Sequence, residues 1–105
     1  MNDIKDTLEE RGSRYGSMEE NADLTAALMA CVLEAPGREN LSNMHEECIH
    51  MIFHKISRMV NGDCMYADNA HDIVGYGKLL EDWINEQKNP SIQPPKLGTK
   101  RYENV

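Results

Sequence analysis

The chain has 105 residues, of which 40% are hydrophobic and 6% aromatic, and its net charge is −7. This length suffices for one domain with a modest core, and no apolar run approaches the ~18 residues of a membrane span. Residues 1–87 carry 7 Lys/Arg against 17 Asp/Glu, which gives −10, whereas residues 88–105 carry 4 against 1, which gives +3. An acidic body argues against general nucleic-acid binding, which requires cations, but permits metal-bound nucleotides and basic protein partners.

The N-terminal residues contain no apolar run of the kind found in secretory signals, which predicts a cytoplasmic protein. The three cysteines are odd in number, and no two are separated by only two residues. This pattern argues against a zinc ribbon and against a disulfide scaffold.

Two helices are predicted in the first third of the chain. The stretch from Asp3 to Arg11 has the pattern of a short helix, and glycines at 12 and 16 predict a turn after it. Ser17 and Glu20 have the spacing of a capping box, so a longer helix should begin at Met18. Its apolar positions recur at every fourth residue until a Pro-Gly pair ends it, and they are Leu24, Leu28 and Val32.

Two further helices follow. Ser42 is the expected N-cap of the first, and Asn61-Gly62 predicts a left-handed stop at its end. Asp68 or Asn69 is expected to cap the last helix, which runs to Lys88. The expected core positions of these two helices are Met44, Cys48, Ile52, Ile56 and Met59, and then Ile73, Gly77, Leu80 and Ile84.

These elements predict an all-α protein: a small bundle of three main helices plus a short N-terminal helix, with no strand. The helical domain should cover residues 1–87. Three of the four prolines fall in residues 88–105, which predicts an extended or disordered tail there.

The third and fourth helices carry most of the chemistry-bearing side chains. Glu47, His50, His54 and Arg58 share one side of the third helix at about 100° per residue. Because a short connection makes the two helices antiparallel, Lys55 and Arg58 should face Asp68 and Asp72.

Three interpretations of this arrangement stay open. The first is a salt-bridged helix pair in which Lys55 and Arg58 neutralise the two aspartates. The second is a Mg²⁺-assisted nucleotide site, with Glu47 and Asp72 as oxygen ligands and the two cations on phosphate. The third is a zinc site made by His50 and His54, whose spacing suits Zn²⁺.

A second small cluster is formed by Arg11, Arg14 and Tyr15. Because glycines flank Arg14 and Tyr15, the backbone there can approach a ligand closely. Arg14 is then a candidate to bind phosphate, and Tyr15 to stack on a base. The alternative is a loop whose tyrosine packs on the bundle.

Several spaced motifs carry a resemblance. They are Arg14-Tyr15-Gly16, His54-Lys55-Ile56-Ser57-Arg58, Asn61-Gly62-Asp63 and the stretch from Asp68 to Tyr76. In this order they resemble a family of small phage and prophage proteins of unknown function, over about residues 10–85.

The pattern is more distantly similar to the MazG-like all-α NTP pyrophosphatases, in which four acids on two helices hold Mg²⁺ against a triphosphate. The corresponding positions here are Glu47, His50, Asn69 and Asp72, so two of the four acids are replaced, and Asp68 is a substitute for one. This departure favours a protein that keeps the cleft and binds without hydrolysis.

The resemblance implies a phage-type nucleotide- or phosphate-binding protein, a homo-oligomer with a cleft between its third and fourth helices. As an enzyme it would hold Mg²⁺ with Glu47 and Asp72, assisted by Asp68, while Lys55 and Arg58 neutralise phosphate. As a binding module it would use Arg14, Tyr15, Lys55 and Arg58. The alternative is an acidic phage protein that binds and inhibits a host protein without catalysis.

Overall fold

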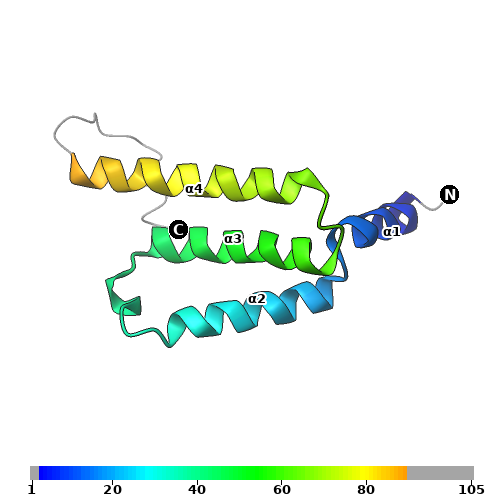
Figure 1. Ribbon diagram of the computed structural model, residues 1–105, viewed down its shortest axis with the longest axis horizontal. Helices are drawn as coiled ribbons and strands as arrows, with labels where there is room; N and C mark the ends of the chain where they lie inside the picture. The colour runs from blue at the N-terminus through cyan, green and yellow to red at the C-terminus, as the bar shows by residue number, and fades with distance from the viewer. Residues whose placement is uncertain (1–2, 90–105) are drawn as a thin grey trace.

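The computed structural model describes residues 3–89, and this part of the chain contains helices and no strand. The helices are α1 (Asp3–Tyr15), α2 (Met18–Leu33), α3 (Asn43–Asn61) and α4 (Ala67–Lys88), with a 3₁₀ turn at Arg38–Asn40 (Figure 1). The predicted all-α class is therefore confirmed. The tail predicted beyond α4 lies, from residue 90, outside the described residues.

The three long helices lie side by side as a single layer with α3 in the middle (Figure 1). α2 and α4 flank α3 on opposite sides, and both pack against it. The short α1 extends from the end of the layer where α3 finishes and also contacts α3. No helix among residues 3–89 is both long and apolar enough to cross a membrane.

Serine caps fix the starts of α2 and α3. The side chain of Ser17 accepts a hydrogen bond from the Glu20 backbone N–H at 3.1 Å, so α2 begins at Met18 as predicted. Ser42 accepts from the backbone N–H of His45, and the Ser42 N–H donates back to His45 Nδ1, each at 3.2 Å. A histidine thus completes the capping box of α3 and supplies the reciprocal acceptor.

Two predicted helix boundaries are wrong. α1 continues through Gly12 to Tyr15, because Gly16 supplies the left-handed residue (φ 80°) and its N–H donates to Gly12 O at 2.8 Å. α4 begins at Ala67, with Tyr66 as N-cap, rather than after a cap at Asp68 or Asn69.

The interface between the helices is largely polar. Among residues 3–89, Cys48 is the one fully buried apolar side chain, whereas Asn21, Thr25, Ser57 and Asn69 are all fully buried. The hydroxyls of Thr25 and Ser57 hydrogen-bond across α2 and α3 at 2.8 Å. The expected apolar core positions are mostly half-buried, and those of α2 and the second half of α4 include Leu24, Leu28, Val32, Leu80 and Ile84.

Candidate functional site

The end of α1 is locked against the end of α3 by two glycines. A Cβ added at Gly16 would lie 2.6 Å from Asn61 O, and one at Gly62 would overlap the backbone of Arg14 and Tyr15. The N–H of Asp63 donates to Arg14 O at 2.9 Å across this junction. These contacts hold the last residues of α1 beside the last turn of α3.

Asparagines reinforce the same junction. Asn21 Nδ2 donates to Tyr15 O at 2.6 Å, and Asn61 Nδ2 donates to Asn21 Oδ1 at 3.0 Å. Since Asn21 is buried, these bonds form away from bulk water, where leaving either group unpaired would be costly. α1, α2 and α3 are thereby fixed at a single point.

The junction gathers an arginine–tyrosine cluster, which comprises Arg11, Arg14, Tyr15, Arg58 and Tyr66. The Arg58 guanidinium lies 4.6 Å from the centre of the Tyr15 ring, and the Arg11 guanidinium lies 5.8 Å from it. The Arg14 guanidinium lies 4.8 Å from the centre of the Tyr66 ring. The two rings meet edge to face, with centres 5.7 Å apart. Two of the residues proposed from sequence to bind ligand, Arg14 and Tyr15, therefore lie next to a third, Arg58.

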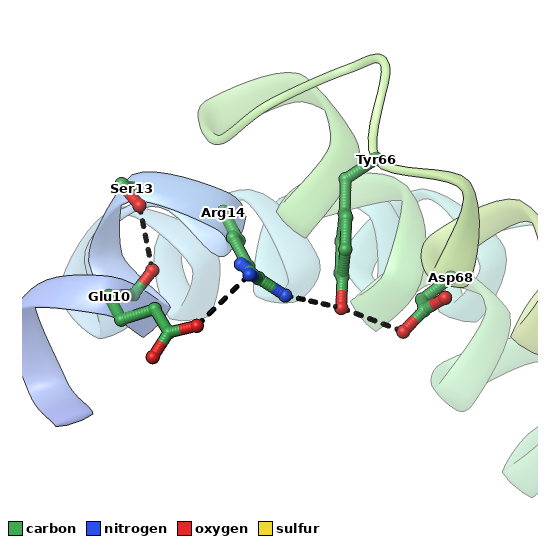
Figure 2. Close-up of polar contacts among 5 residues, drawn as sticks. All are labelled: Glu10, Ser13, Arg14, Tyr66 and Asp68. Carbon is green, nitrogen blue, oxygen red and sulfur yellow. Dashed lines mark hydrogen bonds and ion pairs between the residues drawn. The ribbon is translucent and has the colours of Figure 1, made fainter.

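A line of polar contacts crosses this cluster from α1 to α4 (Figure 2). Arg14 pairs with Glu10 at 3.0 Å and donates to the Tyr66 hydroxyl at 2.8 Å. That hydroxyl in turn donates to Asp68 Oδ2 at 2.8 Å. The hydrogen bond that Arg14 donates to Tyr66 raises the pKa of Arg14, and the hydrogen bond that Tyr66 donates to Asp68 raises the pKa of the Tyr66 hydroxyl. Arg14 therefore stays charged, and Tyr66 stays protonated, at neutral pH.

Lys55 has a separate partner. Its Nζ lies 3.1 Å from Asp72 Oδ2, and its side chain is 12% exposed, whereas that of Asp72 is 42% exposed. Asp72 borders an open hollow, but the residues that line this hollow all belong to α4: His71, Asp72, Gly75, Tyr76 and Leu79. Lys55 is thus held in an ion pair, as in the salt-bridge interpretation, while Arg58 is not part of that pair.

The proposed metal ligands are engaged in different contacts. Glu47 is 72% exposed and lies 4.0 Å from His50, while Asp68 and Asp72 contact Tyr66 and Lys55. Within residues 3–89, no three His, Cys, Asp or Glu side chains are grouped so as to hold a metal ion. The Mg²⁺ site of Glu47, Asp68 and Asp72 and the His50–His54 zinc pair stay predictions.

His54 on α3 is partly buried and lies near two cationic side chains. Burial lowers its pKa most, and the charges of Arg58 and Lys55 lower it further. His54 is therefore neutral at pH 7, and its neighbours on α3 include the cations Arg58 and Lys55.

Asn69 is the one residue of the described chain with a buried side-chain polar atom that lacks a hydrogen-bond partner. Its Nδ2 is unpaired, and the residue is 1% exposed. An unpaired buried amide destabilises a fold by roughly 1–3 kcal/mol. Asn69 is adjacent to Asp68 in the first turn of α4, next to the arginine–tyrosine cluster.

Replacing Asn69 with leucine, which has a similar shape, is expected to raise the free energy of unfolding by about 1 kcal/mol. Urea denaturation of both proteins at one concentration measures this difference. A loss of stability instead would show that the amide has a partner in solution. If stability rises while ligand affinity falls, the amide serves a bound molecule.

Tyr66 is the functional side chain that the sequence reasoning missed. It lies between α3 and α4, in the segment that the sequence predicts only as a short connection. The sequence does contain a signal for this contact. Tyr66 stands two positions before Asp68 at the start of a helix, where a tyrosine hydroxyl can reach the acid.

The comparisons with known proteins identify a family and no function. The model of a domain of unknown function, DUF6378, matches residues 1–84, and this stretch includes every residue of the cluster. No curated protein and no solved structure matches the chain. The phage origin and the likeness to MazG enzymes stay predictions. Because the match covers most of the 105 residues, the chain belongs to the DUF6378 family.

Proposed function

We propose that this protein binds a phosphate-bearing small molecule, and specifically a nucleotide, at the arginine–tyrosine cluster. The observation that carries the proposal is the convergence of three guanidinium groups on two tyrosine rings in an otherwise acidic domain. Such a concentration of positive charge raises the local concentration of anionic ligands.

Arg58 is the central residue of the proposed site. One face of its guanidinium lies over Tyr15, and no carboxylate among residues 3–89 lies within ion-pair distance of it. A stacked guanidinium keeps its N–H donors at its edge, where they can form two parallel hydrogen bonds with a phosphate. Tyr15 therefore orients Arg58. Because Arg11 and Arg58 already lie over the Tyr15 ring, this ring is not open for stacking with a nucleotide base.

The acids in the cluster favour a nucleotide over a bare phosphate. Glu10 and Asp68 lie at the two ends of the line through Arg14 and Tyr66, and their charge would repel an isolated anion. A carboxylate can, however, accept hydrogen bonds from the hydroxyls of a ribose or from the amino group of a base. A molecule that has phosphate at one end and hydroxyl or amino donors at the other matches this pattern.

The proposal requires no protein-bound metal. A nucleotide brings Mg²⁺ on its own phosphates, since Mg²⁺ commonly binds substrate phosphates together with only one or two carboxylates. We propose that Asp68, which contacts Tyr66 of the cluster, is the carboxylate that binds this Mg²⁺. The proposal is one of binding. Hydrolysis of the nucleotide, with Glu47 and Asp72 as metal ligands, would be added to it only if turnover is observed.

The test is calorimetric titration with nucleoside triphosphates, pyrophosphate and a nucleoside, each with and without Mg²⁺. Arg58→Ala is expected to weaken nucleotide binding at least about tenfold, the value for loss of one charged hydrogen bond. The matched control is Arg38→Ala, because Arg38 is an exposed arginine in the 3₁₀ turn at the far end of α3, paired with Glu46. This variant should bind as the wild type does.

Two outcomes would redirect the interpretation. If the wild type binds none of these compounds, the proposal fails, and the alternative of an acidic protein that inhibits a partner protein gains. If pyrophosphate is released from a triphosphate, and Asp72→Ala abolishes the release, the protein is an enzyme with the metal-assisted chemistry expected from the resemblance.

A further inference from the structure

α3 carries an apolar row on a side that neither α2 nor α4 covers completely. The row comprises Ile49, Phe53, Ile56 and Val60, at successive spacings of four, three and four residues. The first three are half-buried although α3 is the middle helix of the layer, and Val60 is 65% exposed. Alternating spacings of three and four are those of a helix seam that packs into another helix.

The row is on the opposite side of α3 from the proposed ligand site. At about 100° per residue, Arg58 lies roughly 140–180° around the helix from each member of the row. On α3, the apolar row and Arg58 thus lie on opposite sides of the helix. On the flanking helices, Leu24 and Leu28 of α2 and Ile73 and Ile84 of α4 are also apolar and only half-buried.

We propose that this apolar row is the interface with a second copy of the same chain, so that two three-helix layers stack face to face. The dimensions fit. α3 has 19 residues, so it is about 28 Å long at ~1.5 Å per residue. Three helices spaced ~9 Å apart make a face about 25 Å wide. The resulting area of roughly 700 Å² is close to the ~800 Å² that each partner contributes to a stable interface of standard size.

A second copy is favoured over a different protein for two reasons. With one fully buried apolar residue among residues 3–89, the layer lacks a hydrophobic core of its own, so the fold requires a cover wherever the chain exists. A second copy of the chain is the one partner that is always present at the same concentration as the chain. A flat face without charged residues in its central row is also self-complementary about a twofold axis, as dimer interfaces must be.

The experiment compares two exposed valines in the full-length protein. Val60→Glu introduces a carboxylate into the row, whereas Val74→Glu introduces it on α4, where Val74 is 70% exposed. Neither side chain is buried in the single chain, so both variants should fold, which circular dichroism verifies. Light scattering after size exclusion is expected to give twice the chain mass for the wild type and for Val74→Glu. Val60→Glu is expected to raise the dissociation constant at least about tenfold, which corresponds to 1.4 kcal/mol.

Three results would overturn the proposal. The first is a wild type that elutes with the mass of one chain throughout a dilution series. The second is equal dissociation of both glutamate variants, which would indicate a general charge effect. The third is a dimer that persists in Val60→Glu and also in Ile56→Glu, which would place the interface elsewhere. Nucleotide binding is measured on the same samples, so a failure of the interface is distinguishable from a failure of the ligand site.

Discussion

Replacing Gly62 with alanine is expected to destabilise the protein by about 3 kcal/mol, the upper end of the range for an overpacked site. An added Cβ would overlap the backbone of Arg14 and Tyr15, and backbone atoms cannot rotate away as a side chain can. α1 would have to move, which would also break the hydrogen bond from Asp63 N to Arg14 O. Because this movement separates Tyr15 from Arg58, nucleotide affinity should fall together with stability.

Gly16→Ala is expected to have a similar effect for a different reason. Gly16 has φ 80°, a conformation that costs an alanine about 1–2 kcal/mol before any collision is counted. The added Cβ would also lie 2.6 Å from Asn61 O. With about 4–8 °C lost per kcal/mol in a domain of this size, a loss of 3 kcal/mol should lower the melting temperature by roughly 12–24 °C.

Gly12→Ala is the matched control for both variants. Gly12 lies inside α1, one turn before the junction, and no atom is within 4 Å of a Cβ built there. Alanine should therefore stabilise the helix by about 0.5–1 kcal/mol. Thermal melts at a single protein concentration compare all three variants. If Gly62→Ala melted like Gly12→Ala, α1 would not be docked on α3 in solution, and the cluster would lose its support.

These glycines illustrate how far the sequence predicts the fold. The four helices follow from capping serines and periodic apolar residues, because these signals act within a few neighbouring residues. The Asn61-Gly62 pair marks the end of α3 as expected, yet Gly62 has φ −116° and is not left-handed. Its role is to leave room for a helix more than 40 residues earlier, and no local pattern contains that information.

The buried polar residues show the same limit. The apolar periodicity gives no role to Thr25 and Ser57, yet these two small polar residues are buried and face one another across α2 and α3. Which side of an amphipathic helix meets its neighbour depends on how closely the backbones approach, and small side chains permit the closest approach. For the candidate site, the sequence identifies the charged side chains but not their partners. It predicts that Lys55 and Arg58 face the same two aspartates, whereas Lys55 pairs with Asp72 and Arg58 lies over the ring of Tyr15.

Asp72→Asn is also expected to destabilise the protein, by breaking the ion pair between α3 and α4. Lys55 is 12% exposed and its Nζ lies 3.1 Å from Asp72 Oδ2, so removing the carboxylate leaves a nearly buried ammonium group unpaired. Breaking a buried ion pair from one side costs about 3–5 kcal/mol. Since Asp72 is 42% exposed, water can replace part of its interaction, and the expected loss is about 2 kcal/mol. Urea denaturation at fixed protein concentration measures it.

Lys55→Met separates a structural from a ligand-binding role for this lysine. Methionine keeps most of the side-chain volume and removes the charge, so Asp72 is left as a partly exposed carboxylate that water can solvate. Stability should then change by less than about 1 kcal/mol, and the double variant Lys55→Met/Asp72→Asn should be more stable than Asp72→Asn alone. Nucleotide affinity should survive Lys55→Met, because the pair with Asp72 holds Lys55 and leaves phosphate binding to Arg58. A loss of affinity in Lys55→Met as large as that in Arg58→Ala would show that the ion pair opens to receive the ligand, and would return Lys55 to the binding site.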